Sequence, residues 1–182
     1  HFPNKSIFSG ADFPEYIFNC FQNWTWNKLF KKEFINKNKL KFQEIKKTND
    51  LLFVCSALIK ANKITTLDKN LISYRKNTGS STQDTNYLDP VEFLKAFDAL
   101  ENLVKGNSTY EKYLTSFYNH KIGGCMYNLF SIKKRKAFAI LFDELKKRAS
   151  DDLEVFREKD CYNKTRYKQY VDVSKMDIKE FI

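Results

Sequence analysis

The residue best placed to do chemistry in this sequence is Asp50. It stands directly before the apolar stretch Leu51 to Ala61, which predicts a buried helix, and its other neighbours are basic or apolar. A carboxylate in this position can act as a general base on a substrate hydroxyl. It can also serve only to stabilise the positive end of the helix dipole. Thr48 or Asn49 can cap the helix in either case.

Other catalytic chemistry finds little support in the residue types. The five glycines form neither a Gly-x-Gly-x-x-Gly nor a Walker pattern, so no glycine loop for nucleotide phosphates is predicted. The two histidines, His1 and His120, are too few for a histidine metal site or a Ser-His-Asp triad, and His120 is expected to be a surface or packing residue. Asp151-Asp152 resembles a metal-binding pair, but its place at an expected helix boundary favours capping.

The charge is unevenly distributed along the 182 residues. Lys and Arg number 32 against 22 Asp and Glu, a net +10, and +8 of this falls in residues 1–80. Basic residues are densest in residues 28–47. This segment could bind a phosphate-bearing ligand, nucleic acid or an anionic membrane surface, or it could be a solvated lysine-rich face without a ligand. Because only five basic residues are Arg, which reads phosphate and guanine bidentately, specific nucleic-acid recognition is not expected.

Composition limits the class of protein. With 42% hydrophobic and 16% aromatic residues the chain is expected to be globular, and it lacks the run of about 20 apolar residues that a membrane-spanning helix needs. The four cysteines are far apart and include no Cys-x-x-Cys, which predicts reduced thiols and a cytoplasmic location. The start, His1-Phe2-Pro3-Asn4, resembles neither a natural N-terminus nor a signal peptide, so we expect a piece of a longer chain.

The elements expected around Asp50 are short. Helical spacing of apolar residues predicts a helix over 12–22, and Trp26, Leu29, Phe30 and Phe34 can share one face of a helix in the segment 23–35. Strands are predicted at 40–42, 64–67 and 71–75, the last two around a turn at 68–70.

In the second half of the chain, the sequence predicts helices whose ends are marked by capping residues and glycine. Asp89 as N-cap, Pro90 at the first position and Gly106 at the end bound one of them. Ser108 and Glu111 open the next, which is expected to weaken near 123–124. A third is predicted over 133–149, and no firm structure is predicted for 160–182.

The combined pattern from Trp26 to Ser81 is similar to one known family. It consists of Trp-Asn-Lys-Leu-Phe at 26–30, Leu-Lys-Phe at 40–42, Asn-Asp at 49–50, a helix, and Leu-Ile-Ser-Tyr-Arg at 71–75 followed by Asn77 and Ser80-Ser81. This order and spacing resembles the acceptor side of family 2 glycosyltransferases of the GT-A fold. The resemblance implies a predominantly helical α/β fragment: residues 1–85 as the back part of a GT-A domain with a few short strands, and residues 86–182 as a C-terminal helical extension.

The resemblance also implies roles for individual residues. Asp50 would be the general base that deprotonates the acceptor hydroxyl during inverting transfer, and Asn49 stands where the family usually has Glu. Trp26 would lie beneath the acceptor, either stacking on a sugar face or simply packing. Lys28 and Arg75 would approach the nucleotide diphosphate or else be ordinary surface charges.

The partners implied are a nucleotide-sugar and a polysaccharide, glycolipid or lipid-linked acceptor, as in bacterial cell-wall or capsular polysaccharide biosynthesis. Mg²⁺ or Mn²⁺ would be held in the parent by an Asp-x-Asp motif that does not occur before Asp50, so this fragment is expected to bind no metal and to be inactive alone. We expect a cytoplasmic protein, peripheral to the inner membrane face, that can self-associate through the face its donor half would cover.

The alternative is a non-enzymatic basic helical module. In that case residues 28–47 would bind nucleic acid or an acidic partner by charge alone.

Overall fold

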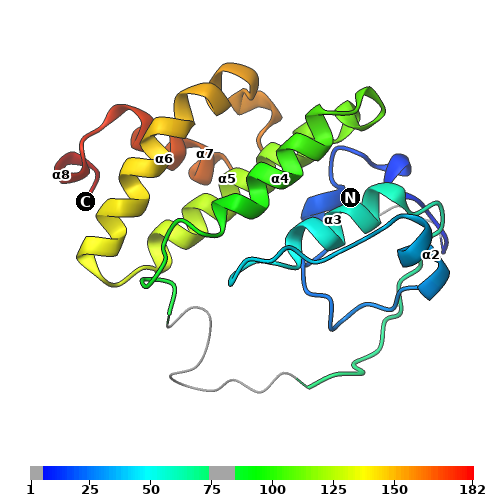
Figure 1. Ribbon diagram of the computed structural model, residues 1–182. Helices are drawn as coiled ribbons and strands as arrows, with labels where there is room; N and C mark the ends of the chain where they lie inside the picture. Colours follow the sequence, from blue (N-terminus) through cyan, green and yellow to red (C-terminus); the bar gives the residue numbers. More distant parts are fainter. Residues whose placement is uncertain (1–5, 74–84) are drawn as a thin grey trace. The chain divides into compact units, whose positions relative to one another are not determined.

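The computed structural model describes residues 6–73 and 85–182, and most of that length is helical (Figure 1). It forms two compact units, one from the described residues up to 73 together with 95–116, the other from 85–94 with 117–182. The α-helices are α1 (Ile17–Cys20), α2 (Lys32–Lys37), α3 (Leu51–Lys60), α4 (Leu94–Lys105), α5 (Leu114–Ser131), α6 (Arg135–Val155), α7 (Lys164–Lys175) and α8 (Ile178–Phe181). Short 3₁₀ helices cover Gly10–Asp12, Ser108–Tyr113 and Glu158–Asp160.

Helix α3 is the centre of the first unit. Its side chains are buried almost all round, as its unbroken apolar sequence predicts. The 3₁₀ helix that starts at Gly10 approaches α3 so closely that a Cβ on Gly10 would lie 2.6 Å from the Leu58 carbonyl oxygen, so only glycine fits there. Helix α1 is fixed by the Ser116 hydroxyl, which accepts from the Phe18 N–H at 2.8 Å and donates to Asn19 Oδ1 at 2.9 Å.

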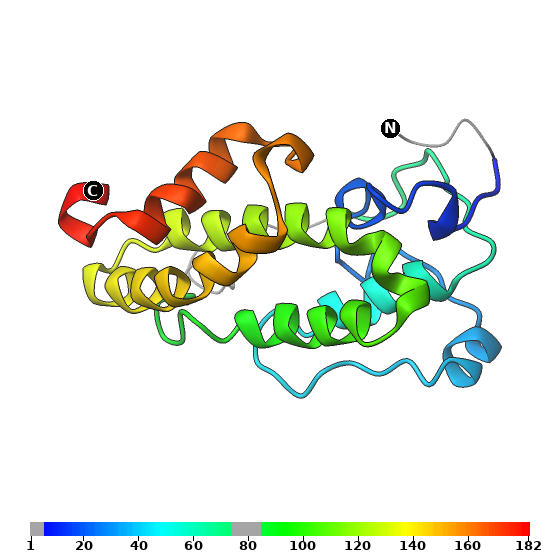
Figure 2. The same cartoon turned by 90° about the horizontal axis from the view of Figure 1, so that it is seen from above.

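In the second unit α6 and α7 lie side by side (Figure 2). The buried positions of α6 recur at three- and four-residue intervals, which places them on one face. A polar contact is buried in this core: Lys121 Nζ of α5 lies 2.6 Å from Asp152 Oδ1 of α6, and the Tyr170 hydroxyl of α7 donates to Asp152 Oδ2 at 2.7 Å. One carboxylate therefore ties together three helices.

The predicted α/β fold class is wrong for the described residues. Segments 40–42 and 64–67 form no strand, nor do residues 71–73, and the only β-type pairing in the described ranges is an isolated bridge between Phe8 and Ile64. A strand needs a neighbour to complete its hydrogen bonds, and the described segments supply only this one pair. The part of the third predicted strand at 74–75 lies outside the described residues. The boundary predicted at residue 85 concerns a domain of the parent and stays a prediction.

Two predicted helices of the first unit are shorter than expected. The helix predicted over 12–22 is confined to α1, and the one predicted within 23–35 begins only at Lys32. Residues 22–28 instead fold around the Lys28 ammonium group, which binds backbone oxygens that a continuous helix would use internally.

Helix α3 and the C-terminal end of α4 lie where the sequence predicts them. α4 starts four residues later than predicted, after turns that include Asp89 and Pro90, and ends at Lys105, where the Gly106 N–H donates to the Asn102 carbonyl. α5 does not weaken at Gly123-Gly124, because the apolar residues on either side of the glycines are buried and outweigh a cost of about 1 kcal/mol per glycine.

The C-terminal part holds more helix than expected. α6 runs past the predicted end at 149 to Val155, so Asp151 and Asp152 lie inside it and cap nothing. The tail predicted to lack firm structure contains α7 and α8. Asn163 caps α7 by accepting from the Arg166 N–H at 3.0 Å.

Within residues 6–73 and 85–182, no helix combines the length and the hydropathy that crossing a bilayer requires.

The buried contact between α5 and α6 predicts a large stability effect. Both its side chains are about 5% exposed or less, so Lys121→Met leaves the Asp152 carboxylate buried beside the Tyr170 hydroxyl alone. We expect the free energy of unfolding, measured by urea denaturation, to fall by about 3–5 kcal/mol.

Two controls accompany this variant. The triple variant K121M/D152L/Y170F removes every member of the polar contact and should recover most of the loss, whereas Lys147→Met on the exposed side of α6 should change stability by less than about 0.5 kcal/mol. A loss below 1 kcal/mol for K121M would show that the pair does not hold this core together.

Candidate functional site

Asp50 lies at the N-cap position of α3 and is half-buried. Its side chain makes no capping hydrogen bond to the helix, and its backbone is in the right-handed helical region (φ −84°, ψ −18°). The turn that leads into it contains Thr48 in a left-handed conformation (φ 60°), with the Leu51 N–H donating to the Thr48 carbonyl at 3.1 Å. The carboxylate is therefore positioned by the turn, while its oxygens are not used by the helix end.

The loop beside Asp50 is organised by Lys28. Its ammonium group donates to the carbonyl oxygens of Gln22 and Trp24, at 2.5 and 2.8 Å, and to Asn27 Oδ1 at 2.8 Å. The same ammonium group interacts electrostatically with Asp50. Lys28 thus holds the loop 22–28 together and places a positive charge near the start of α3.

The loop presents both tryptophans of the chain. Trp24 and Trp26 are 47% and 42% exposed, and their rings stack at a centroid distance of 4.9 Å with an interplanar angle of 15°. Two stacked, half-exposed indoles form a flat apolar surface. Such a surface suits the apolar face of a ring-shaped ligand that also carries polar groups.

The electrostatics favour a basic carboxylate. Burial raises the pKa of Asp50, and this effect is opposed by a hydrogen bond from its own backbone N–H and by the positive charge of Lys28. Burial also lowers the pKa of Lys28, opposed mainly by Asp50. The pair therefore holds a carboxylate that is a stronger proton acceptor than an exposed Asp.

Cys55 of α3 contacts Asn23 at the start of the tryptophan loop. The Cys55 thiol is fully buried and lies 3.8 Å from Asn23 Oδ1, and burial raises its pKa far above the ordinary range. A thiol held in its neutral form is a poor nucleophile, so Cys55 supports the loop and does no covalent chemistry here.

The structure brings some predicted site residues together and separates others. Asp50 and Lys28 interact, and the tryptophan pair lies on the same loop as Lys28. Asn49 is exposed next to Asp50, and its backbone carbonyl accepts from the Gln43 N–H at 3.4 Å. Arg75 lies outside the described residues. His120 is half-buried in α5, and burial lowers its pKa to about 4, so it is neutral at pH 7.

The sequence interpretation did not include Trp24, and it named Lys28 only as a residue that approaches the diphosphate. Trp24 was not assigned a site role, although its spacing from Trp26 already placed two large aromatic rings in one short segment. The structural use of Lys28 had no sequence signal, because its partners are mainly backbone oxygens whose positions depend on the loop conformation.

The described residues do not fit a divalent metal site. Within them, no group of three or more His, Cys, Asp or Glu side chains is arranged to hold a metal ion.

Comparisons with protein-family models, with curated proteins and with solved structures found no match to this chain.

The raised pKa of Asp50 predicts a pH-dependent effect on stability. A carboxyl group whose pKa is higher in the folded state than in the unfolded state destabilises the fold when ionised, and this penalty vanishes below the unfolded pKa of 3.8. We therefore expect Asp50→Asn to keep or raise the free energy of unfolding at pH 7 and to give no such gain at pH 3, as measured by urea denaturation at both values.

Asp68→Asn, at an exposed position in the same unit, is the matched control and should show neither effect. If Asp50 instead serves the helix dipole, D50N would be less stable than the native chain at pH 7, which would contradict the assignment of a substrate-facing carboxylate.

Proposed function

We propose that this chain is the acceptor-side part of an inverting family 2 glycosyltransferase. The parent would transfer a sugar from a nucleotide-sugar to a hydroxyl group of a polysaccharide, glycolipid or lipid-linked acceptor. One observation carries the proposal: the half-buried Asp50 carboxylate makes no helix-capping hydrogen bond and interacts with the lysine that holds the Trp24–Trp26 loop. A sugar acceptor needs a base for its hydroxyl group and an aromatic surface for its ring, and this part of the first unit supplies both residue types.

In the proposed reaction Asp50 is the general base. The acceptor hydroxyl oxygen attacks the anomeric carbon as the bond from that carbon to the diphosphate oxygen breaks, and the leaving nucleoside diphosphate keeps the electron pair. The hydroxyl proton passes to an Asp50 carboxylate oxygen. Burial raises the pKa of this carboxyl group and so improves the proton transfer, while the positive charge of Lys28 keeps the group ionised before the reaction.

The neighbouring residues position the acceptor. The stacked rings of Trp24 and Trp26 offer the apolar face on which a sugar ring can lie. Lys28 is assigned as a positioning residue, because its ammonium group already donates to oxygens of its own loop. Asn49, exposed next to the base in sequence, would contact the acceptor.

Mg²⁺ or Mn²⁺ in the parent would neutralise the leaving diphosphate. Since the described residues hold no arrangement that fits such an ion, we assign it to the donor-binding part and derive no step through it.

The test is sugar transfer by the parent enzyme carrying Asp50→Asn. Removing a general base should lower kcat by about 10²–10⁴-fold with little change in nucleotide-sugar affinity, measured by steady-state kinetics and by donor titration. Asp68→Asn serves as the control and should retain full activity. Undiminished turnover in D50N would refute the assignment of the base.

A surface of the second unit supports a peripheral membrane location at the cytoplasmic face. Residues 133–136, Lys-Lys-Arg-Lys, are all exposed at the junction of α5 and α6. Beside them lies an open hollow of about 360 Å³ bordered by Leu88 and Ile140, which are 70% and 46% exposed, and by Tyr87, whose ring lies 5.7 Å from Lys134 Nζ. Adjacent cations and exposed apolar side chains are the combination that binds an anionic bilayer surface.

The membrane contact predicts salt-sensitive binding to vesicles. Each Lys or Arg near an anionic surface contributes about 1 kcal/mol, so changing all four residues of 133–136 to Gln should lower the partition coefficient on phosphatidylglycerol vesicles at least a hundredfold in co-sedimentation. A control variant removes four exposed lysines elsewhere in the same unit: Lys159, Lys168, Lys175 and Lys179. Equal losses in both variants, or preferential binding to duplex DNA, would contradict a membrane-specific surface and favour a general basic module.

A further inference from the structure

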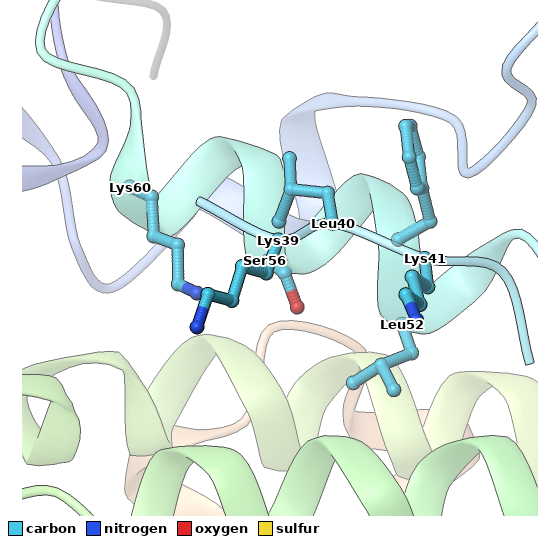
Figure 3. A pocket seen from close by; sticks show the side chains of 7 residues that line it. Lys39, Leu40, Lys41, Leu52, Ser56 and Lys60 are labelled. Carbon is cyan, nitrogen blue, oxygen red and sulfur yellow. The ribbon is translucent and has the colours of Figure 1, made fainter. Parts of the chain in front are cut away.

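A hollow lined in part by lysines lies along α3, on a different face from the Cys55 thiol. Leu52, Ser56 and Lys60 recur every four residues and so share one face of the helix, which borders the chain segment 39–41. The hollow measures about 190 Å³, room for roughly six water molecules at about 30 Å³ each. Its lining is shown in Figure 3 and consists of Lys39, Leu40, Lys41, Leu52, Phe53, Ser56 and Lys60.

The end of α2 builds one wall of this hollow. The Leu40 N–H donates to the Ile35 carbonyl and the Lys39 N–H to the Asn36 carbonyl, at 3.1 and 3.2 Å, which is the hydrogen-bond pattern of a Schellman motif. Lys39 occupies the left-handed position of that motif with φ 51°, where glycine is the usual residue. The left-handed conformation is unfavourable for a residue with a side chain, so Lys39 lowers backbone stability at this position relative to glycine.

The other wall is fixed by Lys60. Its ammonium group donates to the Asn38 carbonyl at 3.3 Å, which joins the last turn of α3 to the end of α2 and leaves further N–H groups of the ammonium for a ligand. Ser56 is buried, and its hydroxyl lies among the lining side chains (Figure 3). It can donate one more hydrogen bond.

The charges of the lining have one sign. Three of the seven side chains are lysines and none is Asp or Glu, so the lining carries positive charge only. Leu40, Leu52 and Phe53 supply apolar wall that weakens screening by water. An anion with several oxygens would balance this positive charge and accept hydrogen bonds from the lysines and from Ser56.

We propose that this hollow binds a phosphate or diphosphate group. Lys39, Lys41 and Lys60 contact its oxygens, the Ser56 hydroxyl donates to it, and the leucine side chains contact the apolar part of the molecule that carries it. The assignment is independent of sugar transfer, because none of these residues belongs to the site around Asp50.

The test is titration of the 182-residue chain with inorganic pyrophosphate, followed by calorimetry and by NMR shifts of the 39–41 and 52–60 amides. Lys39→Gly should weaken binding about tenfold, since it removes one charged contact. The same substitution should raise the midpoint of urea unfolding, because glycine is favoured in the left-handed conformation. Lower affinity together with higher stability separates loss of a ligand contact from damage to the fold.

Further variants complete the test. Lys41→Gln should also weaken binding about tenfold, and the control K32Q/K37Q removes two exposed charges of α2 that do not line the hollow and should change affinity less than twofold. A lipid source is examined with phosphatidylglycerol vesicles in the background in which residues 133–136 are Gln.

Loss of pyrophosphate or vesicle binding in K39G and K41Q, but not in the control, supports the site and identifies which source it accepts. The proposal is overturned if neither probe binds at millimolar concentration, or if the α2 control weakens binding as much as K39G.

Discussion

An ammonium group that leaves water must find oxygen atoms at hydrogen-bond distance, and this requirement shapes both units of the protein. In the first unit Lys28 collects two carbonyl oxygens and an amide oxygen from residues 22–28, which bends that segment into a loop instead of a helix. In the second unit, the Lys121 ammonium group donates a hydrogen bond to one carboxylate oxygen of Asp152, and the Tyr170 hydroxyl donates to the other. The tryptophan loop and the junction of three helices each depend on one lysine.

The elements that the sequence predicted well are those whose signals are local. α3 follows from an apolar run after Asp50, and the end of α4 follows from Gly106, because periodicity and end residues act within one or two turns. The predicted strands failed because pairing requires a distant partner that sequence propensity does not supply. α5 continues through Gly123-Gly124 because burial of its neighbours, a tertiary effect, exceeds the local cost of glycine.

The residues of the candidate site also differ in whether a local sequence signal identifies them. Asp50 was predicted from its position before the helix, whereas the Lys28 contacts depend on a loop conformation that residue types do not specify. The lysine-rich segment also proved to be more than one surface. Lys28 turns toward its own loop, Lys39 and Lys41 line the hollow beside α3, and Lys32 is exposed on α2. The end of α2 could not be predicted from the sequence, because Lys39 occupies the left-handed position where glycine is the usual signal.

The stacked tryptophans have a consequence for spectroscopy. They are the only two in the chain, and both lie half-exposed on the loop that Lys28 holds together, so tryptophan emission comes entirely from this loop. Indole emission responds to the polarity around the ring, and two indoles at a centroid distance of 4.9 Å also couple to give a paired circular-dichroism band. The candidate acceptor site thus carries its own optical label, because the chain holds no other tryptophan.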